Sequence, residues 1–126
     1  MRLHWRKCAG DRWCPLETVV LPDANASGVV VIWSALQTRT IYLGQGGIAM
    51  NVKWARQFEP IARHRNLFAT WASVPEDRQS GVRKYLADRL RPELTDRLAP
   101  EAAIPVNLPW EPETGNGSVG LETPTS

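Results

Sequence analysis

SGVVVIWSALQTRTIYLGQGG, residues 27–47, is the stretch that decides the fold of this 126-residue chain. From Gly28 to Ser34 it is rich in β-branched residues, which favours a strand. A second strand is expected from Thr38 to Leu43, with Thr40 and Tyr42 on one face and Ile41 and Leu43 on the other. The short link between the two strands predicts an antiparallel pair. The glycines of residues 44–47 then allow a tight turn into a helix.

Two amphipathic helices and a third strand are expected after this hairpin. Apolar residues recur at helical spacing over 48–58, and the third strand is expected over 67–73. Ser73-Val74-Pro75-Glu76 has the pattern of a capping box, which predicts the start of a second helix that ends near Leu90, before Pro92. The expected fold is therefore an α+β sandwich, in which a small antiparallel three-stranded sheet packs against helices.

Size and composition predict one domain with a segment on either side of it. We expect residues 1–26 to form an arm whose tryptophans pack on the domain, residues 27–110 to form the domain, and residues 111–126 to be too polar to order. The chain has no apolar run of about 20 residues and no visible signal peptide, so we expect a cytoplasmic protein with no membrane partner. In that compartment Cys8 and Cys14 are expected to be thiols.

Short motifs in the hairpin resemble the two halves of the GIY-YIG nuclease motif. Gly28-Val29-Val30 opens the first strand, and Tyr42-Leu43-Gly44 closes the second. The family's downstream helix motif is matched at four positions, which are Leu86, Ala87, Leu90 and Pro92. The resemblance covers about residues 27–92 and includes the order of the elements, so it implies a GIY-YIG-like sandwich.

The resemblance implies a centre for phosphodiester cleavage. In the family a tyrosine activates water, an arginine on the first helix steadies the phosphate, and a helix glutamate binds one divalent metal ion. Here Val30 takes the place of the first tyrosine, Tyr42 stands at the second, and Asn51 or Val52 takes the place of the arginine. Arg83 replaces the glutamate and would repel the metal. No cofactor is therefore certain, and Mg²⁺ or Mn²⁺ is expected only if nuclease activity is retained.

These substitutions predict an endonuclease-like pseudoenzyme that binds DNA or RNA, with weak or no metal-dependent cleavage. Tyr42 is the candidate catalytic residue, and the residues expected to contact nucleic acid are Gln45, Lys53, Arg56 and Arg83. The net charge of +2 is too small to indicate such a partner. Basic residues are nevertheless concentrated in the stretch 56–97, including the connector IARHRN at residues 61–66.

Other interpretations of the sequence remain open. The same fold is also compatible with an interaction module that binds another protein, or with an active nuclease whose catalytic residues have relocated. His4, Cys8, Cys14 and the distant His64 offer a weaker zinc hypothesis, because they lack a Cys-x-x-Cys pair. Residues 44–49 fit a dinucleotide fingerprint but lack the parallel strands that it needs. We expect Trp54 and Trp71 to fill the core rather than stack on bases, and His64 to be solvated.

Overall fold

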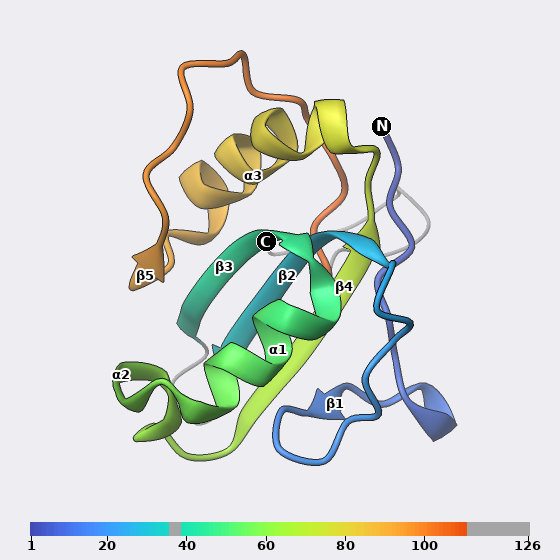
Figure 1. The fold of residues 1–126 in the computed structure, drawn as a ribbon, viewed down its shortest axis with the longest axis vertical. Coiled ribbons are helices and arrows are strands. Elements are labelled where there is room, and N and C mark those ends of the chain that lie inside the picture. The colour runs from blue at the N-terminus through green and yellow to red at the C-terminus, as the bar shows by residue number, and fades with distance from the viewer. Residues whose placement is uncertain (36–38, 111–126) are drawn as a thin grey trace, which may run out of the picture.

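The computed structural model of the protein describes residues 1–35 and 39–110, which form one five-stranded sheet with helices on both faces. The strand order is β1-β4-β2-β3-β5 (Figure 1). The three long strands are β2 (Ser27–Ser34), β3 (Arg39–Gly47) and β4 (Leu67–Ser73), and β2 runs antiparallel to both of its neighbours. The two edge strands, β1 (Cys14–Pro15) and β5 (Leu94–Thr95), have two residues each.

The expected α+β class is confirmed, but the sheet is larger and mixed. β1 pairs antiparallel with β4, whereas β5 runs parallel to β3. The prediction of three antiparallel strands therefore describes the centre of the sheet and omits its edges. Two-residue strands are too short to produce an alternating pattern, so the sequence carries no sign of them.

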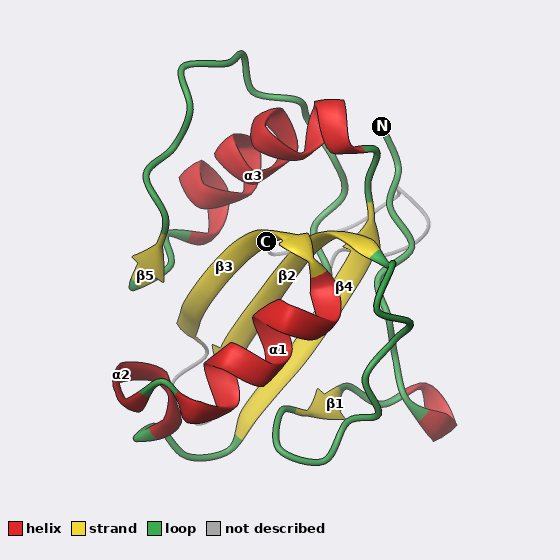
Figure 2. Cartoon of the chain, in the orientation of Figure 1, coloured by secondary structure: helices red, strands yellow, loops and turns green. Residues whose placement is uncertain are grey.

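Helices cover the sheet on both sides (Figure 2). One face packs against α1 (Ile48–Gln57) and the short α2 (Glu59–Ala62), and the other packs against α3 (Glu76–Leu90). Strand β2 serves both layers, because successive side chains of a strand point to opposite faces. Val30 and Ile32 lie in the α1 layer, whereas Val29 and Val31 lie in the α3 layer.

A bulge in β3 changes the predicted facing of its side chains. Ile32 pairs with Tyr42 while Trp33 pairs with Thr40, which leaves Ile41 as the extra residue. Ile41 and Tyr42 are consequently both buried in the α1 layer. The predicted strict alternation of β3 is wrong at this point.

The predicted capping box before α3 does not form. Ser73 stays in β4, where it pairs with Gly28, and the residue that precedes the helix is Pro75. No side chain of the described residues makes a capping hydrogen bond at this end of α3. The strand holds Ser73 in extended backbone, so the helix begins at Glu76 instead.

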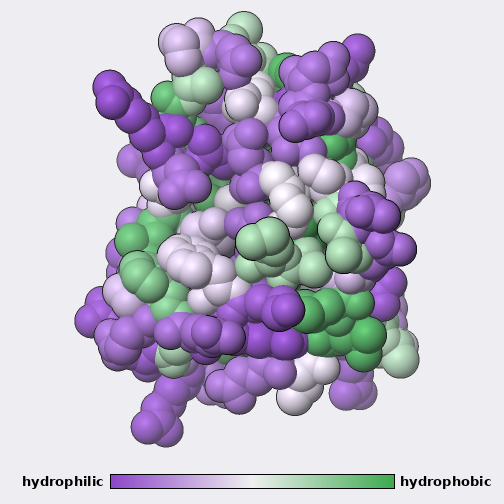
Figure 3. Space-filling view, in the orientation of Figure 1, coloured by the Kyte–Doolittle hydropathy of each residue, from purple (hydrophilic) through white to green (hydrophobic). Residues whose placement is uncertain are grey.

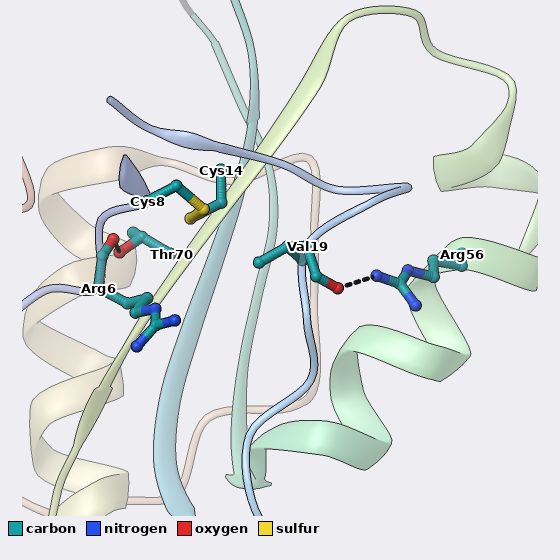
Figure 4. The surroundings of a disulfide bond; sticks show 6 residues. All are labelled: Arg6, Cys8, Cys14, Val19, Arg56 and Thr70. Atoms are coloured by element: carbon teal, nitrogen blue, oxygen red, sulfur yellow. Dashed lines mark hydrogen bonds between the residues drawn. A yellow bond between two sulfur atoms is a disulfide. The ribbon is translucent and has the colours of Figure 1, made fainter. Parts of the chain in front are cut away.

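The N-terminal arm is fastened to the sheet and to α1 (Figure 4). A disulfide joins Cys8 to Cys14, which corrects the prediction of free thiols that followed from the expected compartment. The 3₁₀ turn η1 (Ala9–Asp11) lies inside the loop that the disulfide closes. Trp5 and Trp13 pack against the α3 layer, as expected. The expected disordered tail, residues 111–126, lies outside the described residues.

Residues 92–110, named here the C-terminal segment, return across α3. Ile104 N donates to Gly81 O over 2.9 Å, and a Cβ at Gly81 would collide with Ala102 O and the Ile104 side chain. Farther on, Leu3 N donates to Asn107 Oδ1 over 2.6 Å, and Asn107 Nδ2 donates to Leu3 O over 3.0 Å. The two ends of the described chain are thus held together.

The surface seen in Figure 3 is mostly hydrophilic, with apolar side chains in separate patches. Met50 and Trp54, both on α1, are exposed by 77% and 44%. The prediction that Trp54 fills the core is therefore wrong, whereas Trp71 is 7% exposed and does so. None of the described helices is both long and apolar enough to cross a membrane.

Candidate functional site

Four of the residues singled out in the sequence meet in one hydrogen-bonded group, named here the Tyr42 network. Tyr42 Oη, from β3, donates to Asn51 Oδ1 on α1 over 2.6 Å. Asn51 Nδ2 donates to Gln45 O over 3.1 Å and to Gly47 O over 2.7 Å. Arg83 Nε, from α3, donates to Gln45 Oε1 over 2.6 Å. The network thus joins the end of the hairpin to both long helices.

Gly44 makes room for this network. A Cβ at Gly44 would collide with the Tyr42 hydroxyl and with Asn51 Oδ1, so only glycine allows the two side chains to meet beside the strand. Val30, which takes the place of the family's first tyrosine, pairs with Gly44 in the sheet and is fully buried. It contributes to the apolar layer and brings no polar group to the network.

Tyr42 is a neutral hydrogen-bond donor at ordinary pH. Burial raises the pKa of its phenol to about 12, and the negative charge of Asp96 acts in the same direction, while the positive charge of Arg83 opposes them. A phenol with this pKa is a poor general base near pH 7, because its anion is hardly populated. Its proton instead bonds to Asn51.

The guanidinium of Arg83 is occupied by acceptors of the protein itself. The side chain is buried, with 5% of the residue exposed. Nη1 donates to Thr95 Oγ1 over 3.1 Å and to Asp96 O over 2.9 Å, and Nη2 donates to Arg97 O over 3.0 Å. This geometry fits a residue that fastens the C-terminal segment to α3, and it does not support the predicted contact with nucleic acid.

The other three residues expected to contact nucleic acid differ in exposure and in their hydrogen-bond partners. Arg56 is half-buried and donates from Nε to Leu16 O over 2.8 Å and from Nη2 to Val19 O over 2.6 Å. Gln45 is half-buried within the Tyr42 network, and its Nε2 donates to Ser80 Oγ over 3.2 Å. Lys53 is the one of the four predicted residues that is exposed. The structure therefore does not gather them into one surface.

The described residues offer no cluster of metal ligands. Within residues 1–35 and 39–110, no group of three or more His, Cys, Asp or Glu side chains is placed to hold a metal ion. The zinc hypothesis fails on its own residues, because Cys8 and Cys14 are bonded to each other and are not thiolates.

A basic cleft lies at the end of the sheet away from the Tyr42 network, and the sequence did not predict it. Its volume is about 580 Å³, and it lies between residues 15–18 of the arm and residues 62–67 before β4, with Arg56 in its wall. Arg63 and Arg65 contribute from the connector and are exposed, and Glu17 is the acidic residue of the lining. The basic residues of the connector IARHRN are evident in the sequence, but the sequence does not indicate that the connector lies next to the arm.

His64, also in the lining of the basic cleft, is not the solvated residue that the sequence suggested. Its side chain is 16% exposed, and its Nε2 lies 3.5 Å from Glu93 Oε1. Glu93 Oε2 in turn lies 3.1 Å from Arg39 Nε. One carboxylate therefore connects the edge of the basic cleft to the first residue of β3.

Comparisons with known proteins give no match. No family model matches the chain, and no curated protein or solved structure does so either. The resemblance to the GIY-YIG family consequently depends on the quoted motifs and on the order of the elements, and it stays a prediction.

Proposed function

We propose that this protein is a nucleic-acid-binding domain on a nuclease-like scaffold, and that the Tyr42 network does not carry out metal-dependent cleavage. The observation that carries the proposal is the basic cleft, where Arg56, Arg63 and Arg65 face one acidic residue, Glu17. The proposal keeps the expected class of partner, DNA or RNA, but moves the contact away from Arg83.

The chemistry of the cleft suits a phosphate backbone. Guanidinium groups bind phosphate oxygens through paired N–H donors, so arginine is well suited to such a surface. Arg56 is held in the cleft wall by its bonds to two main-chain carbonyls, which fixes its direction without removing its charge. Arg63 and Arg65 are exposed and can reach a partner from solvent.

The residues of the Tyr42 network argue against the cleavage chemistry. Metal-assisted cleavage needs a carboxylate or a similar ligand to hold the cation, and the network places the cation Arg83 there instead. The phenol of Tyr42, with a pKa of about 12, is not available as a base near neutral pH. Both features favour a scaffold that has kept its shape and lost its catalytic groups.

Fluorescence anisotropy with labelled DNA and RNA, both duplex and single-stranded, tests the binding. Arg63→Gln/Arg65→Gln should weaken binding by roughly tenfold or more at 100 mM salt, and should lower the slope of log K against log salt by about 1–2. The matched control is Arg78→Gln/Arg97→Gln, which removes the same charge from exposed residues outside the cleft. Failure of every probe to bind at 50 mM salt, or an equal loss in the control, would overturn the proposal.

The second half of the proposal is tested by incubating the labelled probes with Mg²⁺ and with Mn²⁺. We expect intact probes after prolonged incubation. Cleavage that disappears in Tyr42→Phe would show that the network is catalytic, and would replace the binding proposal with the active-nuclease alternative.

A further inference from the structure

We infer that the nucleic acid bound in the basic cleft is single-stranded, and that one of its unpaired bases enters a tryptophan cavity on the opposite face of the sheet, at the same end. The cavity has a volume of about 230 Å³ and is lined by Trp13, Trp33, Arg39, Thr40 and Trp110. This inference rests on the proposed function and names the form of the partner.

The tryptophan cavity is built from side chains distant in sequence. Trp33 is buried, with 8% of the residue exposed. Trp13 and Trp110 each contact it with a centroid distance of 5.2 Å and a steep angle between the rings. Trp110 is 44% exposed, so part of its ring is open to solvent at the rim. The exposed part of the Trp110 indole offers a face on which one planar group can stack.

The tryptophan cavity and the basic cleft are neighbours. His64 lines the basic cleft and Arg39 lines the tryptophan cavity. Arg39 Nε pairs with Glu93 Oε2 at 3.1 Å, and His64 Nε2 lies 3.5 Å from Glu93 Oε1 without a hydrogen bond to the described residues. A hydrogen bond of 3.2 Å from Ala35 N to Asn66 O ties the end of β2 to the connector in the same region. A strand whose phosphates lie along Arg63 and Arg65 must therefore turn around this end of the sheet, past Glu93, to bring a base to the tryptophans.

The lining favours a base over the other groups that tryptophan clusters bind. Arg39, whose side chain is 59% exposed at the cavity, is paired with Glu93, so it contributes N–H donors rather than a net charge. Together with the hydroxyl of Thr40 these donors suit the polar edge of a base, which a quaternary ammonium ligand lacks. A base inside a duplex is stacked on both sides and paired along one edge, so it cannot enter the cavity without leaving the helix. A base of a single strand is already unpaired, so it can enter the cavity without the free-energy cost of leaving a duplex.

Trp110→Ala tests the inference, and Trp54→Ala is a closely matched control. Both tryptophans are 44% exposed, but Trp54 lies on α1 and lines neither of the two cavities. Trp110→Ala should lower the affinity for a single-stranded 12-mer by roughly tenfold and leave that for the duplex within twofold. Trp54→Ala should leave both unchanged. Trp110→Phe, which keeps a ring, should restore most of the loss, and thermal melting should show that each variant is folded.

A strand with abasic sites in place of its bases makes the test specific. It should bind the wild type about as weakly as Trp110→Ala binds the normal strand, and Trp110→Ala should not weaken it further. Equal single-strand affinities in Trp110→Ala and wild type, or an equal loss on duplex, would overturn the inference while leaving the basic cleft in place. Failure of all probes, including duplex at 50 mM salt, would instead overturn the proposed function.

Discussion

Replacing Arg83 with glutamine should lower the free energy of unfolding and leave the nucleic-acid affinity of the folded form unchanged. The guanidinium makes four hydrogen bonds. Two of them go to the main-chain carbonyls of Asp96 and Arg97, which are exposed residues. We assume that water replaces the guanidinium at these two carbonyls in the variant, so their loss adds no cost. The bonds to Gln45 and Thr95 are lost, at about 1.5 kcal/mol each for a charged donor. The sum is about 3 kcal/mol of unfolding free energy.

Chemical denaturation followed by tryptophan fluorescence measures this loss directly. For a domain of this size, about 3 kcal/mol corresponds to a fall in Tm of roughly 10–15 °C. Arg78→Gln is the control on the same helix, since Arg78 is exposed, and its unfolding free energy should change by less than about 0.5 kcal/mol. A loss below about 1 kcal/mol in Arg83→Gln would refute the fastening role. Intact stability with lost nucleic-acid binding would return Arg83 to the interface.

Three further predictions concern the Tyr42 network and the arm. Gly44→Ala should reduce the unfolding free energy by roughly 1–3 kcal/mol through the collision with Tyr42, whereas Gly47→Ala, whose Cβ would meet only Met50 at 3.9 Å, should cost far less; equal losses would contradict the packing argument. In an absorbance titration one phenol should ionise near pH 12 and be missing in Tyr42→Phe. Because the pKa of Tyr42 in the folded protein is raised above the ordinary 10.0, its contribution to the unfolding free energy should be complete below pH 10 and lost between pH 10 and 12. Ionisation of Tyr42 at or below pH 10 would contradict this. Reduction of the disulfide, which joins cysteines six positions apart, should lower the unfolding free energy by about 2 kcal/mol, and a Cys8→Ser/Cys14→Ser variant should show no response to reductant; an equal response would place the effect elsewhere.

The central elements could be predicted because each has a local pattern. The third strand was expected over 67–73, which is the range found for β4, and the helix expected over 48–58 is found as Ile48–Gln57. The edge strands, the bulge at Ile41 and the failed capping box depend on which strand lies alongside, so no window of sequence contains them. The disulfide was missed because the expected compartment argued against it.

The candidate site could be predicted only in part. Motif spacing led to Tyr42, Asn51 and Arg83, and Gln45 was among the expected contacts with nucleic acid. The structure links all four. The role of Arg83 could not be foreseen, because its acceptors lie 38 residues before it and 12–14 residues after it. The basic cleft likewise joins the arm to the middle of the chain, and the tryptophan cavity joins residues from both ends of the described chain, which composition and periodicity do not bring together.

The pairing of Leu3 with Asn107 has a consequence for biosynthesis. Its partners are 104 residues apart, so Leu3 waits for Asn107 until nearly all of the described chain has emerged from the ribosome. The hairpin and α1 can form early from local contacts, whereas α3 stays uncovered until Ile104 reaches Gly81. A nascent chain from which residue 104 has not yet emerged would therefore carry α3 without the contact between Ile104 and Gly81.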